Sequence, residues 1–234
     1  MESSRGTGEV ARMRADARRN RDQLLNAARD VFVERGAGAP LEEIARRAGV
    51  GIATLYRRFP DRESLMRAVV LDALGRVAQE GEEALAEEPD AFEALARYMH
   101  RALEMRIAAV IPALLGEILL RDEEMLRARA AGSAPVEEMI RLAQAQGTLR
   151  PDVAFGDIGL MIVRLSRPLP GSFPPPLEAE LAHRHLDLVI DGLRAAPARG
   201  RLRGPGMTLG DLQALEPVQP DVAGSEDVDE DPDA

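Results

Sequence analysis

Apolar side chains recur every three or four residues along most of this chain, and this spacing predicts helices that bury one face. A first helix is predicted at about residues 18–35. A second helix opens at Pro40, where the missing N–H costs little, and Gly49 supplies the turn that follows it. A third, short helix ends before Pro60, and a long fourth helix covers about 62–88.

The rest of the chain, to about residue 196, keeps the same helical spacing. A break is predicted at Gly132 with Pro135, because neither residue favours a helix interior. No segment alternates apolar and polar residues with the period of two that a strand requires. The pattern therefore predicts an all-α fold, with further helices at about 90–107, 108–116, 117–131, 134–147, 154–167 and 177–195.

The chain divides into four predicted segments. Residues 1–17 are predicted to be a flexible basic arm, and residues 18–66 a three-helix unit that contains a helix-turn-helix. Residues 67–196 are predicted to form a helical body. Residues 197–234 shift to Gly, Pro, Asp and Glu and are predicted to be a mostly disordered acidic tail. A short apolar patch within that tail could dock on the body: Met207, Leu209, Leu212 and Leu215.

Charge is distributed unevenly along the chain, whose net charge is −10. Residues 1–62 contain 13 Arg and 9 acidic residues, whereas residues 63–203 contain 17 Arg and 22 acidic residues. Residues 204–234 contain 9 acidic residues and no basic residue. The acidity therefore lies in the tail, and a site for a polyanion is expected only in the basic N-terminal quarter.

Composition and motifs exclude several classes of function. The chain has no Cys, which rules out disulfides, thiolate zinc sites and cysteine nucleophiles. Residues 1–23 do not resemble a signal peptide, and no run approaches the roughly 20 apolar residues of a membrane helix, so a cytoplasmic protein is expected. His183 and His185 point to different sides of a helix, so no metal is expected. The sequence lacks phosphate-loop, dinucleotide-binding, zinc-protease and nucleophile-elbow motifs, so neither a cofactor nor catalysis is expected.

One side of the third helix carries residues that suit DNA, while Leu55 and Phe59 face inward. Tyr56 can donate to a phosphate oxygen and pack its ring on a sugar or a thymine methyl. Thr54 offers both a hydroxyl and a methyl group. Further candidates are small or apolar residues that allow close approach and arginines where phosphates would flank the groove: Gly51, Ile52, Ala53, Arg57, Arg58, Arg62 and, at the end of the arm, Arg18. A merely solvated helix face is the alternative interpretation.

The same region resembles the DNA-binding domain of the tetracycline-repressor (TetR) family over about residues 18–66. The resemblance rests on fixed positions in three helices: Ile44-Ala45, Ala48-Gly49-Val50, Thr54-Leu55-Tyr56, Phe59 and Arg62-Glu63-x-Leu65. The chain departs from the family pattern at Pro40, where the family often has a capping Ser or Thr that touches a phosphate. It also departs at Ile52, which is often polar, at Arg58, which is often His, and at Arg62, which is often Lys.

The resemblance implies a C-terminal domain that binds a small effector and dimerises through its last two helices. Candidates for the effector site are Met99, Met105, Ile111, Leu115, Met139, Met161 and Arg164, with ordinary core packing as the alternative for each apolar residue. Arg106, Glu117 and Arg164 could fix the polarity of a ligand, or could be surface residues. Candidates for the dimer interface are Ile158, Leu160, Ile162, Val163, Leu181, His185, Leu188, Val189 and Leu193.

These observations lead to one hypothesis and two alternatives. The hypothesis is a homodimeric transcriptional regulator, more specifically a ligand-responsive repressor, that binds a pseudo-palindromic operator in double-stranded DNA. The first alternative is an enzyme without a recognisable motif. The second is a helical protein-interaction module, which would leave the polar face of residues 51–58 unexplained.

Overall fold

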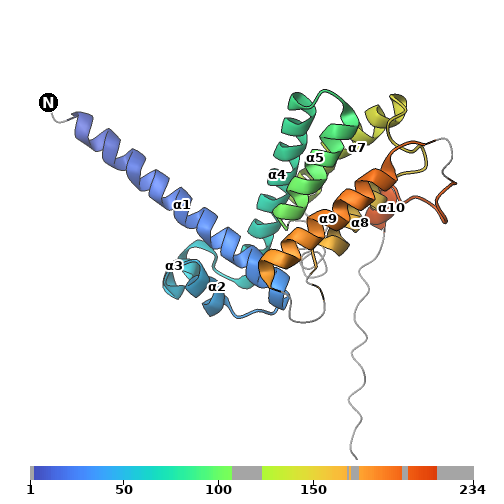
Figure 1. The fold of residues 1–234 in the computed structure, drawn as a ribbon. Helices are drawn as coiled ribbons and strands as arrows, with labels where there is room; N and C mark the ends of the chain where they lie inside the picture. Colours follow the sequence, from blue (N-terminus) through green and yellow to red (C-terminus); the bar gives the residue numbers. More distant parts are fainter. Residues whose placement is uncertain (1–2, 107–122, 168, 170–173, 197–199, 215–234) are drawn as a thin grey trace, which may run out of the picture.

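A computed structural model describes residues 3–106, 123–167, 169, 174–196 and 200–214 of the chain. Within these ranges the secondary structure is helical, and Leu149 and Arg194 form a single antiparallel bridge. The helices in chain order are α1 (Ser3–Arg35), α2 (Leu41–Arg47), α3 (Ile52–Arg58), α4 (Arg62–Glu87), α5 (Ala91–Glu104), α7 (Glu123–Ala145), α8 (Phe155–Leu165), α9 (Pro175–Leu193) and α10 (Leu209–Ala214). The predicted all-α fold is confirmed (Figure 1).

The N-terminal unit packs α1, α2, α3 and the first half of α4 around one apolar core, to which the start of α7 adds the buried Met125. Phe32, Ile44, Leu55 and Leu65 are completely buried in this core, each from a different helix. Gly49 has φ +68 in the turn between α2 and α3, a conformation that is easy for glycine and strained for other residues. The turn therefore fixes the angle between the two short helices.

Helix α1 begins earlier than the sequence pattern predicts. The pattern places a flexible arm at residues 1–17, whereas the helix begins at Ser3 and continues without a break to Arg35. Its N-terminal half extends away from the other helices (Figure 1). The apolar spacing from which helix starts are predicted reports burial against a core, so it gives no signal for a helical stretch that projects from the body.

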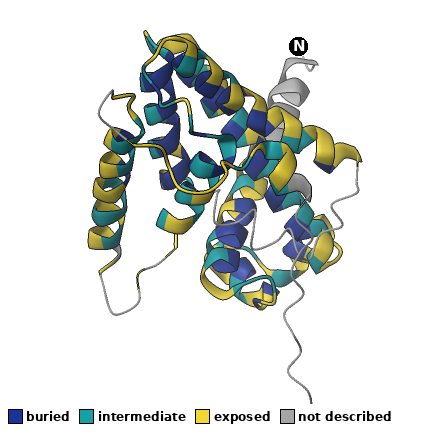
Figure 2. Cartoon of the chain, turned by 90° about the vertical axis from the view of Figure 1, so that its right-hand side faces the viewer, coloured by how far each residue is buried: buried dark blue, intermediate teal, exposed yellow. Residues whose placement is uncertain are grey.

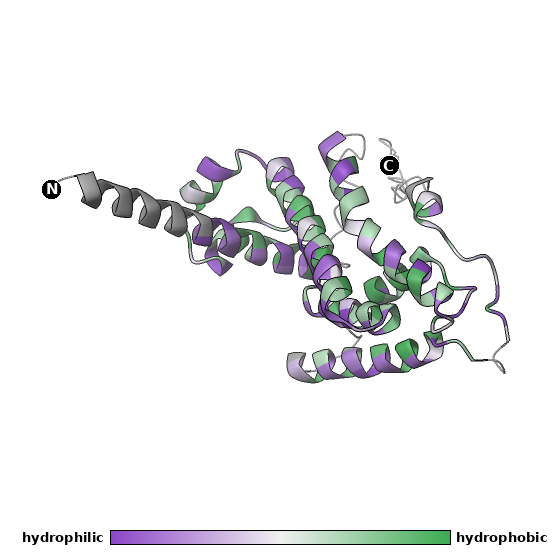
Figure 3. Ribbon diagram, turned by 90° about the horizontal axis from the view of Figure 1, so that it is seen from above, coloured by the Kyte–Doolittle hydropathy of each residue, from purple (hydrophilic) through white to green (hydrophobic). Residues whose placement is uncertain are grey.

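The C-terminal body packs α5 and α7 against α4, and α8 and α9 against α5, around a second apolar core. Helix α4 contributes Leu65 and Leu74 to the first core and Val77 and Ala84 to the second. Buried residues face inward between the helices and exposed residues face outward (Figure 2). Polar and apolar residues accordingly lie on different faces of the helices (Figure 3). Helix α4 is thus one continuous element shared by both cores.

Helix α7 does not break where the sequence predicts a break. The helix continues through Gly132 and Pro135, and both residues are buried. Gly81 of α4 lies opposite Pro135, so closely that a Cβ at position 81 would be 2.6 Å from the Pro135 Cβ. Close packing between α4 and α7 thus overrides the local preference for a break, and the prediction at this point is wrong.

Residues 200–214 lie against α8, although the sequence predicts a mostly disordered tail from residue 197. The backbone N–H of Gly156 donates to the Met207 carbonyl at 2.8 Å, and the Leu202 N–H donates to Asp152 Oδ2 at 2.8 Å. Arg150 binds both Asp152 and the Gly200 carbonyl. Met207, Leu209 and Leu212 are half-buried here, as the apolar patch suggested, while Leu215 lies outside the described residues.

Among the described helices, none is long and apolar enough to span a membrane.

Candidate nucleic-acid interface

Helix α3 separates its buried and exposed residues cleanly. Leu55 is fully buried and Phe59, which caps the helix, is 6% exposed, so these two side chains hold the helix on the N-terminal core. Tyr56 is 45% exposed, although large aromatic side chains are usually covered. Arg57 and Arg58 are exposed beside it. The helix therefore presents an outward face of hydrogen-bond donors and positive charge, which we call the α3 face.

The remaining candidates on α3 lie where the sequence pattern predicts. Gly51 and Ala53 are exposed, and a Cβ at position 51 would meet nothing within 4 Å, so the approach to the start of the helix is open. Thr54 is half-buried and its hydroxyl accepts from Arg57 Nη2 at 3.0 Å, which orients that guanidinium along the helix. Ile52 is half-buried against the core. The α3 face thus has the shape and chemistry needed to enter a major groove.

Arg62 has a structural role that the sequence did not predict. Its Nη1 donates to the Ala37 carbonyl at 2.8 Å and to the Ala39 carbonyl at 2.5 Å, so it holds the loop between α1 and α2. These bonds give Arg62 a structural role, and its predicted contact with a phosphate stays a prediction. Sequence alone could not reveal this role, because the bonded carbonyls lie 23 and 25 residues away.

The start of α4 beside Arg62 is capped by its own sequence. The Asp61 carboxylate accepts from the Ser64 backbone N–H at 2.7 Å, and the Asp61 backbone N–H donates to the Ser64 hydroxyl at 3.4 Å. Helix α2 has no such cap, because the Pro40 side chain cannot form a hydrogen bond. Side-chain caps of this kind typically stabilise a helix by about 0.5–2 kcal/mol.

An ion-paired arginine braces α2 against α1. Arg47 donates from Nη1 and Nη2 to the two Glu34 oxygens, each at 2.8 Å, and this pairing holds the pKa of the Glu34 carboxyl below its usual range. On the other side of α1, the buried Arg29 donates to Asp72 of α4 at 2.8 Å. These bonds fix the orientation of α1 relative to α2 and α4. Arg18 belongs to the part of α1 whose side chains lie outside the described residues.

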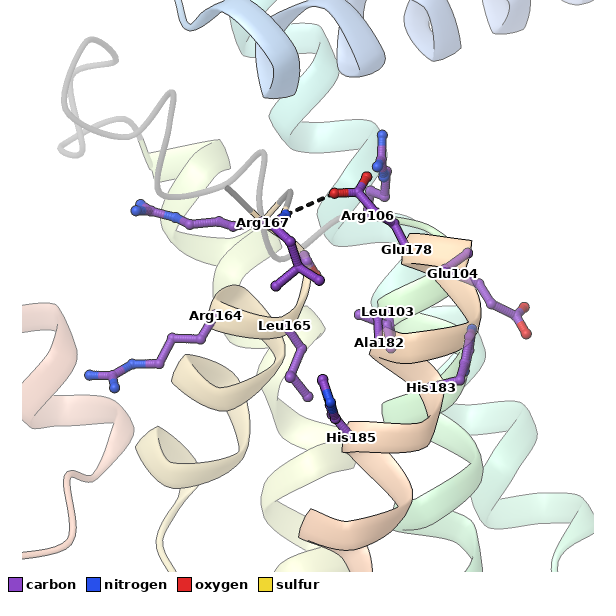
Figure 4. Close-up of a pocket in the computed structure, with 13 residues that line it drawn as sticks. Leu103, Glu104, Arg106, Arg164, Leu165, Arg167, Glu178, Ala182, His183 and His185 are labelled. Carbon is purple, nitrogen blue, oxygen red and sulfur yellow. Dashed lines mark hydrogen bonds between the residues drawn. The ribbon is translucent and has the colours of Figure 1, made fainter. Parts of the chain in front are cut away.

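The effector-site candidates are spread over different parts of the body. Met99 and Met139 are buried in the C-terminal core, while Met105 and Met161 are half-buried. Ile111, Leu115 and Glu117 lie outside the described residues. Arg164 is exposed at the edge of a cavity of about 160 Å³ between the ends of α5, α8 and α9 (Figure 4). The structure thus brings Arg164 and Arg106 to one cavity and places Met99 and Met139 in the core.

The dimer candidates divide into exposed and buried groups. Leu188 is 68% exposed on α9 and Leu160 is 41% exposed on α8. Leu177, which sequence analysis did not single out, is 40% exposed. His185 is exposed as well, whereas Val163, Leu181, Val189 and Leu193 are half-buried. Ile158 and Ile162 are 1% and 3% exposed in the core of their own chain, so the prediction that they contact a partner is corrected.

A histidine pair joins α5 to α9, and sequence analysis did not anticipate it. The Nδ1 atoms of His100 and His183 are 2.9 Å apart, and His100 Nε2 lies 3.1 Å from Asp187 Oδ1. One of the two Nδ1 atoms must carry the hydrogen of this bond, so the pair is a polar clamp between the helices. Among the described residues, no group of three or more His, Cys, Asp or Glu side chains is arranged to hold a metal ion.

Comparisons with known proteins agree with this geometry. The family model described as "Bacterial regulatory proteins, tetR family" matches residues 24–69. A second one, "Transcriptional regulator SbtR-like, C-terminal domain", matches residues 90–195. The crystal structure of the TetR transcriptional regulator SCO0520 from Streptomyces coelicolor is 33% identical, with a TM-score of 0.53. The match covers 75% of this chain and 99% of that one. The chain belongs to the TetR family.

Other relatives place the TetR-family chain among DNA-binding regulators. The TetR transcription regulatory protein of Mycobacterium vanbaalenii is 33% identical over 78% of this chain and 99% of that chain, with a TM-score of 0.55. The HTH-type transcriptional regulator UidR of Escherichia coli is 28% identical over 155 residues, which are 60% of this chain and 74% of UidR. The family model over residues 24–69 contains both α2 and α3, so these two helices form the helix-turn-helix of this family member.

Proposed function

We propose that this TetR-family regulator is a homodimeric, ligand-responsive repressor that binds a pseudo-palindromic operator through the α3 faces of its two subunits. The observation that carries the proposal is the exposed Tyr56 with Arg57 and Arg58 on the outer side of a helix that Leu55 anchors. Family membership favours a regulator over an enzyme or a simple interaction module. Its partner is chromosomal DNA, so we place the protein in the cytoplasm.

Exposed leucines support dimerisation through α8 and α9. Leu160, Leu177 and Leu188 are large apolar side chains with 40% or more of their surface exposed. On α9, Leu177, Leu181 and Leu188 lie four and seven residues apart and so share one face of the helix. Packing this face against its symmetry mate would bury them in a four-helix bundle. Two α3 faces would then meet half-sites about 34–36 Å apart, or somewhat more.

Helix α4 supports the proposed response to a ligand. It carries core residues of the DNA-binding unit at one end and core residues of the body at the other. A ligand that changes the packing of the body would tilt α4 and alter the distance between the two α3 faces, to an extent set by its differential affinity for the two states. A fold neighbour, LfrR of Mycobacterium smegmatis, was crystallised in complex with proflavine.

The test of DNA binding uses the full chain and a labelled duplex from the region upstream of its own gene. We expect fluorescence anisotropy to show an affinity that falls steeply with salt, with the slope set by the number of phosphates neutralised. Arg57→Gln should reduce that slope by about 2, because each of the two subunits loses one phosphate contact. Arg141→Gln is the matched control, since Arg141 lies exposed on α7 and pairs with Glu138. Equal, salt-insensitive binding by all three proteins, or no binding, would reject the proposal.

A further inference from the structure

Two histidine rings, His100 of α5 and His183 of α9, meet end to end. Their Nδ1 atoms are 2.9 Å apart, and the planes of the rings differ by 9°. The ring centroids are 5.2 Å apart, which is as far as two imidazoles can be while their Nδ1 atoms keep this distance. The rings therefore lie in nearly one plane with each Nδ1 pointing at the other, as an N–H···N hydrogen bond requires. Nitrogens that point at each other do not converge on a third point, so the geometry favours a shared hydrogen over a metal ion.

This bond limits the number of protons that the pair can hold. A neutral imidazole has one nitrogen that donates and one that accepts, whereas both nitrogens of a protonated imidazole donate. His100 Nε2 lies 3.1 Å from Asp187 Oδ1, so this carboxylate accepts the Nε2 hydrogen. With one extra proton, His100 donates to Asp187 and to His183 at once, and the bond between the rings persists. With two extra protons, both Nδ1 atoms carry hydrogens, and a contact between two positive charges replaces the bond.

The other charged groups around His100 are engaged with one another. Arg97 pairs with Glu88 at 3.1 Å, and Arg194 pairs with Glu93 at 2.9 Å. These four side chains line the same surface pocket as His100 and Asp187. Asp187 is thus the carboxylate of this lining that contacts the pair, and it stabilises the first extra proton on His100.

On the other side, His183 adjoins the cavity of about 160 Å³ between the ends of α5, α8 and α9. The carboxylates of the cavity lining are held by other groups: Glu104 pairs with Arg101 at 2.7 Å, and Glu178 accepts from the Leu169 backbone N–H at 2.8 Å. The basic residues of this lining are Arg106, Arg164 and Arg167. Both lining carboxylates are therefore already engaged when a second proton arrives at His183.

The pair ties down a part of α9 that few apolar contacts hold. Among the described side chains of α9, the buried ones are Leu186 and Ile190, both in its second half. From residue 176 to residue 185 the side chains are half-buried or exposed. In the described ranges, the His183 bond is the side-chain hydrogen bond that joins this first half of α9 to α5. Loss of the bond should therefore let the first half open, while Leu186 and Ile190 keep the second half in place.

We propose that His100 and His183 form a proton-sensitive clamp, which holds the first half of α9 on α5 with up to one extra proton and releases it with two. Histidine side chains change charge between about pH 5 and pH 8, so moderate acid is the signal. Because the open state binds the second proton better than the closed state does, acid favours opening. The consequence for DNA rests on the proposed function, in which Leu177, Leu181 and Leu188 of the same helix contact the partner subunit.

The first experiment counts protons and contains no DNA. Nitrogen-15 NMR of the full chain, labelled at its three histidines, distinguishes ring nitrogens that carry a hydrogen from those that do not. His183→Asn and His185→Asn assign the signals. At about pH 8 we expect one Nδ1 of the pair to carry a hydrogen, and at about pH 5 we expect both to do so. Hydrogens on both Nδ1 atoms at the higher pH, or on only one at the lower pH, would overturn the proposal.

Hydrogen–deuterium exchange of the full chain then measures the opening, as the protection of each amide relative to an unfolded peptide at the same pH. Protection of residues 179–185 should fall at least about tenfold between the same two pH values, because a hydrogen bond is lost and like charges meet. His183→Asn has an amide group that donates and accepts but takes up no proton, so its protection should not fall. The same result is expected for His100→Asn, which serves if the first variant does not fold.

His185→Asn is the matched control for the exchange measurement. Its ring lies on the opposite side of α9 from His183 (Figure 4), so this variant should lose protection in acid as the unaltered chain does. No acid-dependent loss in the unaltered chain would overturn the proposal. An equal loss in His183→Asn or His100→Asn would overturn it as well, because the opening would then not depend on the pair.

The last experiment tests the consequence for DNA. Fluorescence anisotropy with the operator duplex should show that acid weakens binding by the unaltered chain more than binding by His183→Asn. If both proteins bind the duplex and acid weakens them equally, the coupling of the clamp to DNA is wrong and the proposed function stands. If no duplex is bound at either pH, the proposed function fails, and the NMR and exchange results still decide whether the clamp exists.

Discussion

Two adjacent residues of α3 should affect different properties when each is shortened to alanine: Leu55 the stability of the fold, and Tyr56 the affinity for the operator. Leu55 is fully buried in the N-terminal core and is the buried residue within the seven-residue helix, so Leu55→Ala removes its main anchor. Buried leucine-to-alanine changes typically cost about 2–5 kcal/mol, and we take about 3 kcal/mol for this site. With a urea dependence of about 2 kcal/mol per molar, the unfolding midpoint of the N-terminal unit should fall by about 1.5 M.

Tyr56→Ala should change the free energy of unfolding by no more than about 0.5 kcal/mol, because the ring projects from the surface. Its operator affinity should fall by about 1–3 kcal/mol, which is about 5- to 150-fold. Urea unfolding followed by circular dichroism gives the first quantity, and fluorescence anisotropy with an operator duplex gives the second. The assignment of the two faces is refuted if Tyr56→Ala destabilises the fold as much as Leu55→Ala, or if it binds the operator with full affinity.

Three further changes test other parts of the structure. Asp72→Asn should destabilise the protein by about 3–5 kcal/mol in urea unfolding, because it leaves the buried Arg29 guanidinium without its charged partner. A loss of stability no larger than that from breaking a surface ion pair would contradict the burial of the Arg29–Asp72 pair. Gly156→Ala would bring a Cβ within 2.7 Å of the Met207 carbonyl oxygen, so limited proteolysis should cut the segment after α9 faster while the body stays folded. Burial raises the pKa of the Tyr98 hydroxyl, so the unfolded chain loses this proton at a lower pH than the folded chain does. Stability should therefore fall as pH rises above about 10, the pKa of tyrosine in the unfolded chain. Tyr98→Phe should weaken that alkaline decline in thermal unfolding, and an unchanged decline would show that Tyr98 does not cause it.

The N-terminal unit could be predicted from sequence because its determinants are local. The spacing of Ile44, Leu55 and Leu65 defines three buried faces, and Gly49 marks the turn between two of them. The outward-facing residues of α3 follow from the same spacing, which is why the exposure of Tyr56 could be predicted. A short helix with one polar face leaves few alternative arrangements.

The contacts that sequence analysis missed depend on distant residues. Arg62 binds carbonyls in another loop, and Pro135 stays within a helix because it packs against Gly81. On α8 the periodicity predicts a helix, but apolar residues surround much of it, so spacing alone could not tell the buried Ile158 from the exposed Leu160. Long-range packing, rather than local preference, decided each of these cases.

The central claim is that α3 lies in the major groove of an operator, and a chemical nuclease attached to that helix tests it most directly. The chain has no native cysteine, so Ala53→Cys on the exposed side of α3 provides a single attachment site for an iron chelate. Glu137→Cys on the exposed side of α7 is the matched control. We predict that the chelate at position 53 cuts the duplex in two clusters about one helical turn apart or somewhat more, and that the chelate at position 137 does not cut. Cleavage from position 137 but not from position 53, or no localised cleavage from a bound protein, would contradict this account.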